Sequence, residues 1–364
     1  MKLGIVGCGL IGGSIALSLE QNHSISILDT FDNLEKIRQR LPQALVTDNM
    51  EMFLKNCPEV VFIAVPGSSV IDVMRGLSTG LGKGTIVTDT TSVKAPITKA
   101  AMEIFKDGAT FIGGHPMTGS EKSGIEAAQP LLFQNSVYVL TPQENTPQES
   151  LEVLIRIIKE LGARVLVASS DVHDKITAAV SHLPQILAVE LVNLVDDLSS
   201  QEENYIALAA GGFRDMTRIA SSNYLMWKDI LYFNAQNIAD MIDLLEARLS
   251  AISSNLRRGA IDSVKTNFGQ ANRARGKIPK GAKGFLQSLY DLLIMVDDKP
   301  GILFEITKSL FEKGINIKDI ELVKVREGTG GVFRISFESQ EIMNIAAQTL
   351  EQKGFVVLSR DNDQ

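Results

Sequence analysis

A glycine-rich turn near the start of the chain places the strongest limit on what this sequence can fold into. The apolar run Lys2–Val6 is typical of a buried strand, and a helix is expected over Ser14–Gln21; between them stands the segment Gly7-Cys8-Gly9-Leu10-Ile11-Gly12. In this pattern the first glycine permits a tight turn, the second leaves room for a pyrophosphate, and the third lets helix and strand pack closely. Free N–H groups at the helix N-terminus attract phosphate. The segment therefore predicts a dinucleotide-binding fold with these residues, Gly7, Gly9, Leu10, Ile11 and Gly12, at the cofactor.

The end of the next expected strand bears on which dinucleotide is bound. Ser26–Leu28 is followed by Asp29, at about the 20-residue spacing that a ribose-binding acid requires. A carboxylate there accepts hydrogen bonds from the ribose hydroxyls and repels a 2′-phosphate, and Thr30–Asp32 contains no arginine to reverse that preference. We therefore expect NAD rather than NADP. The alternative is that Asp29 is only a turn residue at the strand end.

Further apolar runs predict a doubly wound parallel sheet over residues 1–168. Glu59–Pro66 and Thr85–Asp89 are expected to be buried strands, and strands near Val137–Leu140 and Arg164–Val167 to complete the same sheet. Ligands of open α/β sheets bind beyond the carboxyl ends of the strands, which predicts cofactor contacts from the loops that hold Val65, Pro66 and Ser92. Ser92 can equally be a helix N-cap.

The segment from Gly113 to Gly124 contains a single histidine, His115, among glycines and hydroxyl side chains. Imidazole exchanges a proton near neutral pH, and glycine allows a ligand to approach the backbone closely. A loop that holds such a histidine, downstream of a dinucleotide site, indicates a dehydrogenase with His115 as its acid–base group.

Residues 169–280 are expected to form an all-α domain. Long apolar helices beyond a complete sheet have no core of their own to cover, so we expect them to pack on the same region of a second chain as a homodimer. A kink is expected at Pro184. His173 and His182 are two and a half turns apart on a straight helix, so their spacing does not predict a two-histidine metal site, whereas His182 and Gln185 can share a face.

A second cluster of polar residues follows in the same region. Asp215 and Arg218 have the helical spacing of an ion pair, and an arginine that faces a pocket binds a carboxylate through its planar fork. The one tryptophan, Trp227, can be either a core residue or a pocket wall.

The last part of the chain predicts a small α+β domain. Residues 271–285 are basic and rich in glycine and are expected to be a linker. Residues 288–364 follow a strand–helix–strand–strand–helix–strand order, which is a ferredoxin-like layer.

Bulk properties exclude several classes of protein. The 364 residues have a net charge of -7, which argues against a nucleic-acid surface, and two cysteines cannot form a disulfide framework. No apolar run approaches the length of a membrane span, so a cytoplasmic protein is expected.

The chain resembles the prephenate and arogenate dehydrogenase family of tyrosine biosynthesis from residue 1 to about residue 280. The resemblance rests on Gly7-x-Gly-x-x-Gly12, Asp89-x-x-Ser92-Val-Lys94, Gly113-Gly-His115-Pro-Met-x-Gly-Ser-Glu121, His173-Asp174, Ser181-His-Leu-Pro184, Gly212-Phe-x-Asp215-x-x-Arg218 and Met226-Trp227. The tail, with Asp298-x-Pro300-Gly301 and Gly314-Ile-Asn316-Ile317, resembles an amino-acid-sensing ACT domain.

The resemblance implies an NAD-dependent oxidative decarboxylation of prephenate to 4-hydroxyphenylpyruvate, without a metal. It assigns the general base to His115 with Ser92 orienting it, and the substrate carboxylate to Arg218. Glu121 and Asp215 would form an ionic network that gates the pocket, and Gln185, His182 and Trp227 would complete the substrate site. The ACT-like tail implies an effector, expected to be tyrosine, at Asp298, Gly301, Asn316 and Ile317.

Three other functions stay open. Gln185 stands where some prephenate-using relatives have histidine, which leaves arogenate as an alternative substrate. A β-hydroxyacid dehydrogenase has a related order of domains, but it uses a catalytic lysine where this chain has His173, Asp174 and Lys175. A non-enzymatic NAD-binding amino-acid sensor would leave the His115 segment and Arg218 without a role.

Overall fold

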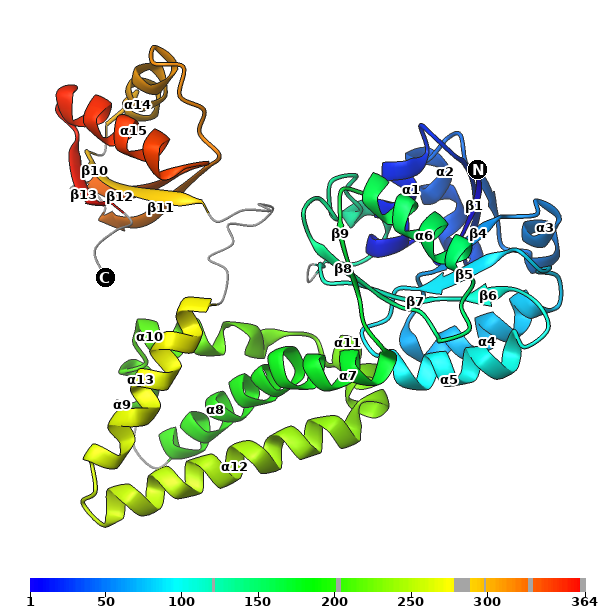
Figure 1. Ribbon diagram of the computed structural model, residues 1–364, viewed down its shortest axis with the longest axis horizontal. Coiled ribbons are helices and arrows are strands. Elements are labelled where there is room, and N and C mark those ends of the chain that lie inside the picture. The colour runs from blue at the N-terminus through cyan, green and yellow to red at the C-terminus, as the bar shows by residue number, and fades with distance from the viewer. Residues whose placement is uncertain (120–121, 201–203, 278–288, 298, 327–329, 361–364) are drawn as a thin grey trace. The chain divides into compact units, whose positions relative to one another are not determined.

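The computed structural model describes residues 1–119, 122–200, 204–277, 289–297, 299–326 and 330–360. The chain divides into two compact units, residues 1–261 and residues 262–364 (Figure 1).

A six-stranded parallel sheet forms the centre of the first unit. Its strand order is β3-β2-β1-β4-β5-β6, the order of a doubly wound dinucleotide-binding fold. The strands are β1 Lys2–Val6, β2 Ser24–Leu28, β3 Leu45–Thr47, β4 Val60–Ile63, β5 Ile86–Asp89 and β6 Thr110–Phe111. The helices between them are α1 Leu10–Leu19, α2 Leu34–Arg40, α3 Met50–Lys55, α4 Gly67–Ser78 and α5 Ala95–Ile104, with the short turn η1 Phe31–Asn33. The predicted fold class is confirmed.

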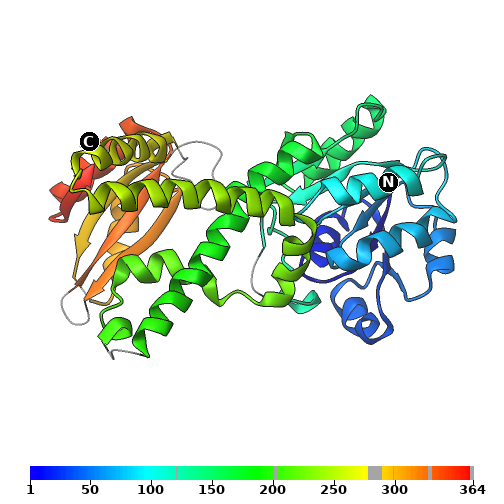
Figure 2. The same ribbon diagram turned by 90° about the horizontal axis from the view of Figure 1, so that it is seen from below.

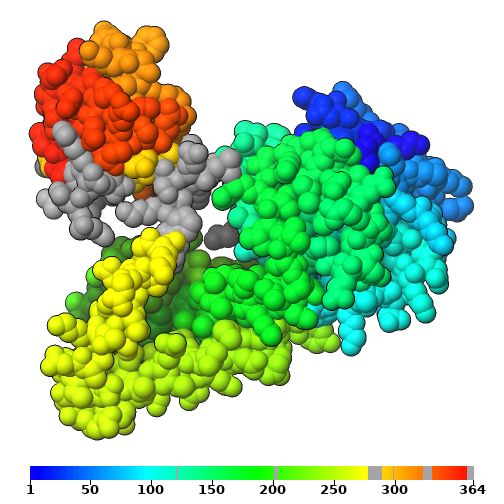
Figure 3. Space-filling model, viewed as in Figure 1, coloured from blue at the N-terminus to red at the C-terminus, as the bar shows by residue number. Residues whose placement is uncertain are grey.

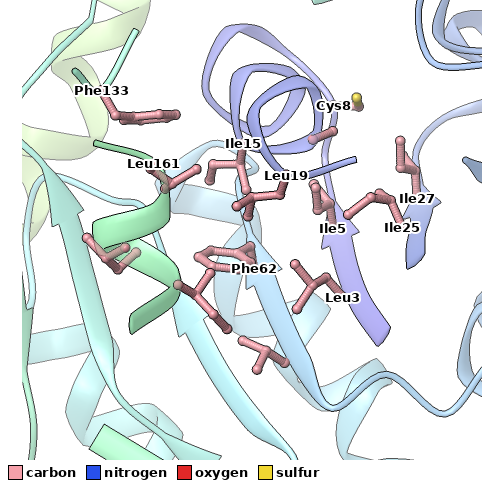
Figure 4. Close-up of a cluster of buried hydrophobic side chains, with 14 of the residues drawn as sticks. Leu3, Ile5, Cys8, Ile15, Leu19, Ile25, Ile27, Phe62, Phe133 and Leu161 are labelled. Carbon is pink, nitrogen blue, oxygen red and sulfur yellow. The ribbon is translucent and has the colours of Figure 1, made fainter. Parts of the chain in front are cut away.

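Two hydrophobic layers hold helices on both faces of this sheet. On one face, side chains of β1, β2 and α1 form one cluster with those of α6, Gln148–Glu160. Figure 4 shows Leu3, Ile5 and Ile15 of this cluster. On the other face, Phe53 of α3 and Met74 of α4 pack on strand residues of β1, β4 and β5. Full burial of each such side chain stabilises the fold by about 1.5–3 kcal/mol.

The prediction that the later strands complete the main sheet is wrong. Strands β7 Gly113–Pro116, β8 Val137–Thr141 and β9 Arg164–Val167 form a separate three-stranded sheet, in which β7 is antiparallel to β8 and β8 is parallel to β9. The main sheet ends because the N–H of Gly114 donates to the carboxylate of Asp89, 3.2 Å away, instead of to a backbone carbonyl of β5. His115 therefore lies on a strand and not in a loop. The turn η2, Ile125–Ala127, separates β7 from β8.

Helices make up the rest of the first unit, and α8 and α12 extend away from the sheet in both views (Figures 1 and 2). They are α7 Ser170–Thr177, the π-helical turn η3 Ala178–His182, α8 Leu183–Ser199, α9 Asn204–Ala207, α10 Gly211–Thr217, η4 Arg218–Ser221, α11 Tyr224–Phe233 and α12 Ala235–Arg257. The chain from Ser170 to Ser199 is one continuous helix. The π turn Ala178–His182 lies just before Pro184, and such a wide turn accommodates the missing N–H of proline. The kink expected at Pro184 stays a prediction.

This continuous helix also corrects the expectation that no segment is long and apolar enough for a membrane. By length and composition alone, Ser170–Ser199 could cross one, with a mean hydropathy of 1.4 over its most apolar window. Its buried polar residues His173, Asp174 and His182 instead make hydrogen bonds inside the first unit.

The second unit contains the predicted ferredoxin-like layer. Its sheet has the order β11-β12-β10-β13, and each described pair is antiparallel. The elements are α13 Asp262–Lys277, β10 Tyr290–Val296, α14 Ile302–Phe311, β11 Asp319–Arg326, β12 Gly330–Phe337, α15 Gln340–Gln352 and β13 Val356–Arg360. The linker expected over 271–285 is wrong in its first part, because residues 271–277, with two alanines and two arginines that favour helix, belong to α13. Residues 278–288 lie outside the described part of the chain.

Candidate active site

A cleft of about 680 Å³ lies beyond the carboxyl ends of β4 and β5, where the helical region meets the nucleotide-binding region. Six segments contribute to its walls: the glycine-rich turn, the loop after β4, the loop after β5, the chain from His115 onward, and the helices η3 and α11. The lining residues that the sequence had singled out are Gly9, Leu10, Ile11, Val65, Pro66, Ser92, His115, His182 and Trp227. Residues predicted from widely separated motifs thus line one cavity.

The glycine-rich turn forms a cradle that fits a pyrophosphate. Gly7 has a φ of +85°, which L side chains rarely adopt, and a Cβ on Gly12 would lie 1.9 Å from the carbonyl oxygen of Gly7. By contrast, nothing lies within 4 Å of a Cβ built on Gly9, which faces the cleft at the N-terminus of α1. Two of the glycines are therefore needed for packing, and the third keeps open the space in which phosphate oxygens can reach backbone N–H groups.

Asp29 connects the end of β2 to this turn. Its Oδ2 accepts from the backbone N–H of Cys8 at 2.6 Å, and its Oδ1 accepts from the N–H of Thr30 at 2.7 Å and from the amide of Asn33 at 2.8 Å. The carboxylate is held in place at the edge of the turn, and its contact with a ribose stays a prediction.

A fully buried ion pair fixes the chain just before His115. Lys94 Nζ donates to a carboxylate oxygen of Asp89, to Thr91 Oγ1 at 2.9 Å and to the carbonyl oxygen of Gly114 at 2.7 Å, so each of its three protons has an acceptor. Asp89 in turn accepts from the N–H of Gly114. The backbone of Gly114, the residue before His115, is thus fixed on both sides: its N–H donates to the anionic Asp89, and its carbonyl oxygen accepts from the cationic Lys94. Burial lowers the pKa of Lys94, although the nearby carboxylates of Asp89 and Asp174 oppose that shift.

His115 is buried at the back of the cleft, and its ring is held by a second histidine. Its Nδ1 lies 2.8 Å from Nε2 of His173, whose Nδ1 lies 2.7 Å from a carboxylate oxygen of Asp174. Burial moves the pKa of His115 well below its usual range, and the positive charge of Lys94 acts in the same direction. The imidazole is therefore neutral at physiological pH, as a general base must be.

His182 forms the opposite wall and is also neutral. Its Nδ1 lies 3.1 Å from the side-chain amide nitrogen of Asn234, and its ring packs edge-on against Trp227 with 6.0 Å between ring centres. Burial lowers the pKa of His182 to about 4, against the opposing charge of Asp174. Trp227 is thus a wall of the cleft, which settles the two possibilities that the sequence left for it.

Comparison with known proteins identifies the family to which this chain belongs. Two family models match the chain: "Prephenate dehydrogenase, nucleotide-binding domain" over residues 15–167 and "Prephenate dehydrogenase, dimerization domain" over residues 169–270. The chain belongs to the prephenate dehydrogenase family. It is 34% identical to a prephenate dehydrogenase of Bacillus subtilis over 96% of this chain and 95% of that protein.

Solved structures of family members cover three quarters of the chain. A prephenate dehydrogenase from A. aeolicus in complex with hydroxyphenyl propionate and NAD+ is 29% identical, with a TM-score of 0.70, over 76% of this chain and 98% of its own. An arogenate dehydrogenase from Synechocystis is 27% identical, with a TM-score of 0.69, over 76% of this chain and 99% of its own.

Several residues that the prephenate dehydrogenase resemblance assigned to the substrate do not line the cleft. Arg218 and Asp215 are exposed, on η4 and α10, and no ion pair joins them in the described part of the chain. Gln185 is buried, and its amide donates to the carbonyl oxygen of Ile219 at 2.9 Å. Glu121 lies outside the described residues, as does Asp298 of the expected effector site. Ser92 does line the cleft, but the ring hydrogen bond of His115 that the structure shows runs to His173, so an orienting role for Ser92 stays a prediction.

The sequence interpretation missed four polar residues behind the two histidines. His173, Asp174 and Lys94 were noted as parts of motifs but were given no role, and Asn234 was not noticed. A usable signal existed for the first three, since charged or polar residues beside apolar runs are rarely buried unless they are paired. The assumption of a straight helix hid the fact that His173 and His182 contribute to the same site, because the π turn changes the angular relation between them.

Proposed function

We propose that the chain oxidises prephenate, with NAD as the hydride acceptor, to 4-hydroxyphenylpyruvate and carbon dioxide. The observation that carries this proposal is the position of His115, a neutral buried imidazole whose Nδ1 is bonded to His173 and which shares a cleft with the glycine-rich turn. NAD, when bound, accepts a hydride at its nicotinamide ring.

In the proposed reaction His115 accepts a hydrogen bond from the C4 hydroxyl of the substrate and draws its proton as the C4 hydrogen leaves as hydride. The carboxylate on the ring leaves as carbon dioxide, and its bonding electrons make the ring aromatic. The proton on His115 returns to the phenol oxygen, so no proton is gained or lost overall. Aromatisation stabilises the developing electrons, which is why the step needs no metal.

We assign the substrate carboxylate to Arg218, whose guanidinium can grip it through two parallel hydrogen bonds. Arg218 is exposed and outside the cleft, so this role requires η4 and α10, of this chain or of a second copy in a homodimer, to approach the cleft when substrate binds. Glu121 and Asp215 would complete the ionic network at the entrance.

The test follows NADH absorbance with prephenate and with arogenate, each with NAD and with NADP. We expect the prephenate and NAD pair to give the highest kcat/KM. His115→Asn should lower kcat by about 10²–10⁴-fold with substrate binding largely kept. His23→Asn is the matched control, because that imidazole bonds Glu160 and does not line the cleft, and it should keep full turnover. Unchanged turnover in His115→Asn would refute the assignment of the base, and a preference for arogenate would replace the substrate.

We further infer that the helical region forms a homodimer. Its matching family model is that of a dimerization domain, and α12 lies along the outside of the region with its side chains at the surface (Figure 3). Leu244, Leu249 and Leu256 of α12 are each more than half exposed, as are Val180 and Leu194 on the continuous helix. Exposed apolar side chains in this number are typical of an interface.

We also propose that the second unit is an ACT domain that binds an aromatic amino acid, with tyrosine as the expected effector. The turn before α14 places Gly301 at a φ of +88°, and Asn316 and Ile317 precede β11. With Asp298, these residues would hold the effector.

We also propose a cytoplasmic location for the protein. Cys8 and Cys57 are both free thiols, as a reducing compartment favours.

A further inference from the structure

We propose that buried hydrogen bonds around Asp174 fix opposite tautomers on the two histidines of the cleft. His115 presents an unprotonated Nε2, and His182 presents a protonated Nε2. The use made of these two nitrogens rests on the proposed function, whereas the tautomers themselves are properties of the chain and do not depend on the substrate.

The carboxylate of Asp174 determines where the proton of His173 lies. Asp174 Oδ1 accepts from the backbone N–H of Lys94 and Oδ2 accepts from the backbone N–H of Ala95, both at 2.8 Å. Because backbone N–H groups can only donate, both oxygens of Asp174 accept, and these two bonds stabilise the ionised carboxylate. The ring nitrogen that lies 2.7 Å from Oδ1, His173 Nδ1, must therefore carry a proton.

The direction of this bond sets the next one. A neutral imidazole with a proton on Nδ1 has only a lone pair on Nε2, so Nε2 of His173 accepts. The hydrogen bond of 2.8 Å to His115 then requires a proton on Nδ1 of His115. His115 is left with a lone pair on Nε2, the nitrogen that is free to face the cleft. That is the tautomer a general base needs to take a hydroxyl proton.

The orientation of the Asn234 amide follows from its hydrogen-bond partners. Its Nδ2 lies 2.9 Å from the backbone carbonyl oxygen of Asp174, which can only accept, so this atom is the donating nitrogen. Its Oδ1 accepts from Asn237 at 2.8 Å, which agrees with that orientation. The other proton of Nδ2 points to His182 Nδ1 at 3.1 Å, which must accept. A neutral His182 therefore carries its proton on Nε2.

The cleft thus offers one acceptor and one donor from two neutral imidazoles. His115 takes the hydroxyl that is to be oxidised, and His182 donates to an oxygen of the same substrate. Asp174, His173 and Asn234 do not line the cleft, and we describe them as positioning residues. A substrate with an ammonium group at the position facing His182 would meet an N–H instead of a lone pair, so this donor selects for a carbonyl or carboxylate oxygen there.

The direct test is ¹⁵N NMR of the full-length chain labelled in its histidine rings, at about pH 8, where imidazole is ordinarily neutral. The chain has only four histidines, so each pair of signals can be assigned by replacing one residue at a time. We expect a proton on Nδ1 and none on Nε2 for His115, and the reverse for His182. The opposite tautomer on either ring, or a doubly protonated His173, would overturn the proposal.

Variants connect the tautomers to turnover. Asp174→Asn removes the charge that holds the proton on Nδ1 of His173 and places an amide N–H against the backbone N–H of Lys94 or of Ala95, so we expect the single tautomer of His115 to be lost and kcat to fall by about 10²–10⁴-fold. His173→Gln retains a side-chain carbonyl that can accept from His115 and should keep far more activity than His173→Leu, with His23→Gln as the control that changes nothing. Equal activity in the two His173 variants would contradict the mechanism.

Asn234→Leu tests the donor separately. It frees Nδ1 of His182, and we expect KM for the substrate to rise while kcat is largely kept, in contrast to Asp174→Asn. If the tautomers are found as expected but prephenate is not oxidised, the proposed function fails and this inference stands. If prephenate is oxidised and either tautomer is reversed, this inference alone fails.

Discussion

His115 combines two properties that usually exclude each other in a histidine: it is buried, and it is used to accept a proton. Burial opposes the charged form, and the cation of Lys94 adds to that effect, so the pKa of His115 lies well below 6.5. The proton that it draws must therefore be held only briefly and returned within the same catalytic cycle. A base of this kind works best when product formation restores its neutral state, as the return of the proton to a phenol oxygen does.

The depressed pKa predicts a particular pH dependence. The active form is the neutral imidazole, so kcat/KM should stay on its plateau as the pH falls through 6.5 and decline only at the lower pKa of His115. The measurement is kcat/KM for NAD reduction between about pH 5 and pH 9. Buried neutral histidines also cost stability below pH 6.5, because the unfolded chain takes up the proton first. Circular dichroism at each pH is therefore the control. An acid limb centred at 6.5 or above in a folded protein would contradict the assignment.

Within the turn between β1 and α1, Gly12 and Gly9 are needed for different reasons: the first for close packing and the second for open space at the cofactor. A methyl group on Gly12 would collide with the carbonyl oxygen of Gly7 and force α1 away from the sheet, whereas a methyl group on Gly9 would meet only open space. Gly12→Ala should cost about 1–3 kcal/mol of stability and weaken NAD binding as well. Gly9→Ala should weaken NAD binding with an unchanged melting temperature, because its methyl group takes the place of the pyrophosphate.

Thermal unfolding and a titration with NADH distinguish these cases. Gly82→Ala is the control, since nothing lies within 4 Å of its Cβ and it does not line the cleft, so neither quantity should change. Equal melting temperatures for Gly12→Ala and Gly9→Ala would show that close packing at Gly12 is not what the turn requires.

Some elements could be predicted from the sequence and others could not. The strands and helices of the main sheet follow from apolar runs and a glycine pattern, because both are local signals. The transfer of β7 to a second sheet does not, since it depends on Asp89 and Lys94 bonding to Gly114 across 20 or more residues. The π turn before Pro184 does not follow from the position of the proline in the sequence either. For the same reason Asp174 and Asn234 could be predicted neither as neighbours nor as partners of the site.

For the whole molecule, the order of its parts could be predicted, but their limits could not. The compact division falls between residues 261 and 262, so α13 groups with the second unit, while the family model of the dimerization domain runs to residue 270. The predicted boundaries at residues 168, 280 and 288 stay predictions. Each unit has its own buried hydrophobic core, in the second unit around Leu292, Ile306 and Ile335, so the two can serve different functions.

That division predicts the effect of removing residues 288–364. The cores of the first unit contain none of these residues, so NAD reduction with prephenate should be largely retained in the shortened chain. Inhibition by tyrosine should weaken by about tenfold or more, since the proposed coupling between effector and active site is lost. Asn316→Ala, which changes an exposed side chain in the proposed effector site, should have the same effect in the full-length chain without altering its melting temperature. Initial rates at several concentrations of tyrosine and prephenate decide the outcome. If the shortened chain is still inhibited, and prephenate relieves the inhibition competitively, tyrosine binds in the cleft as a product mimic and the second unit is not its sensor.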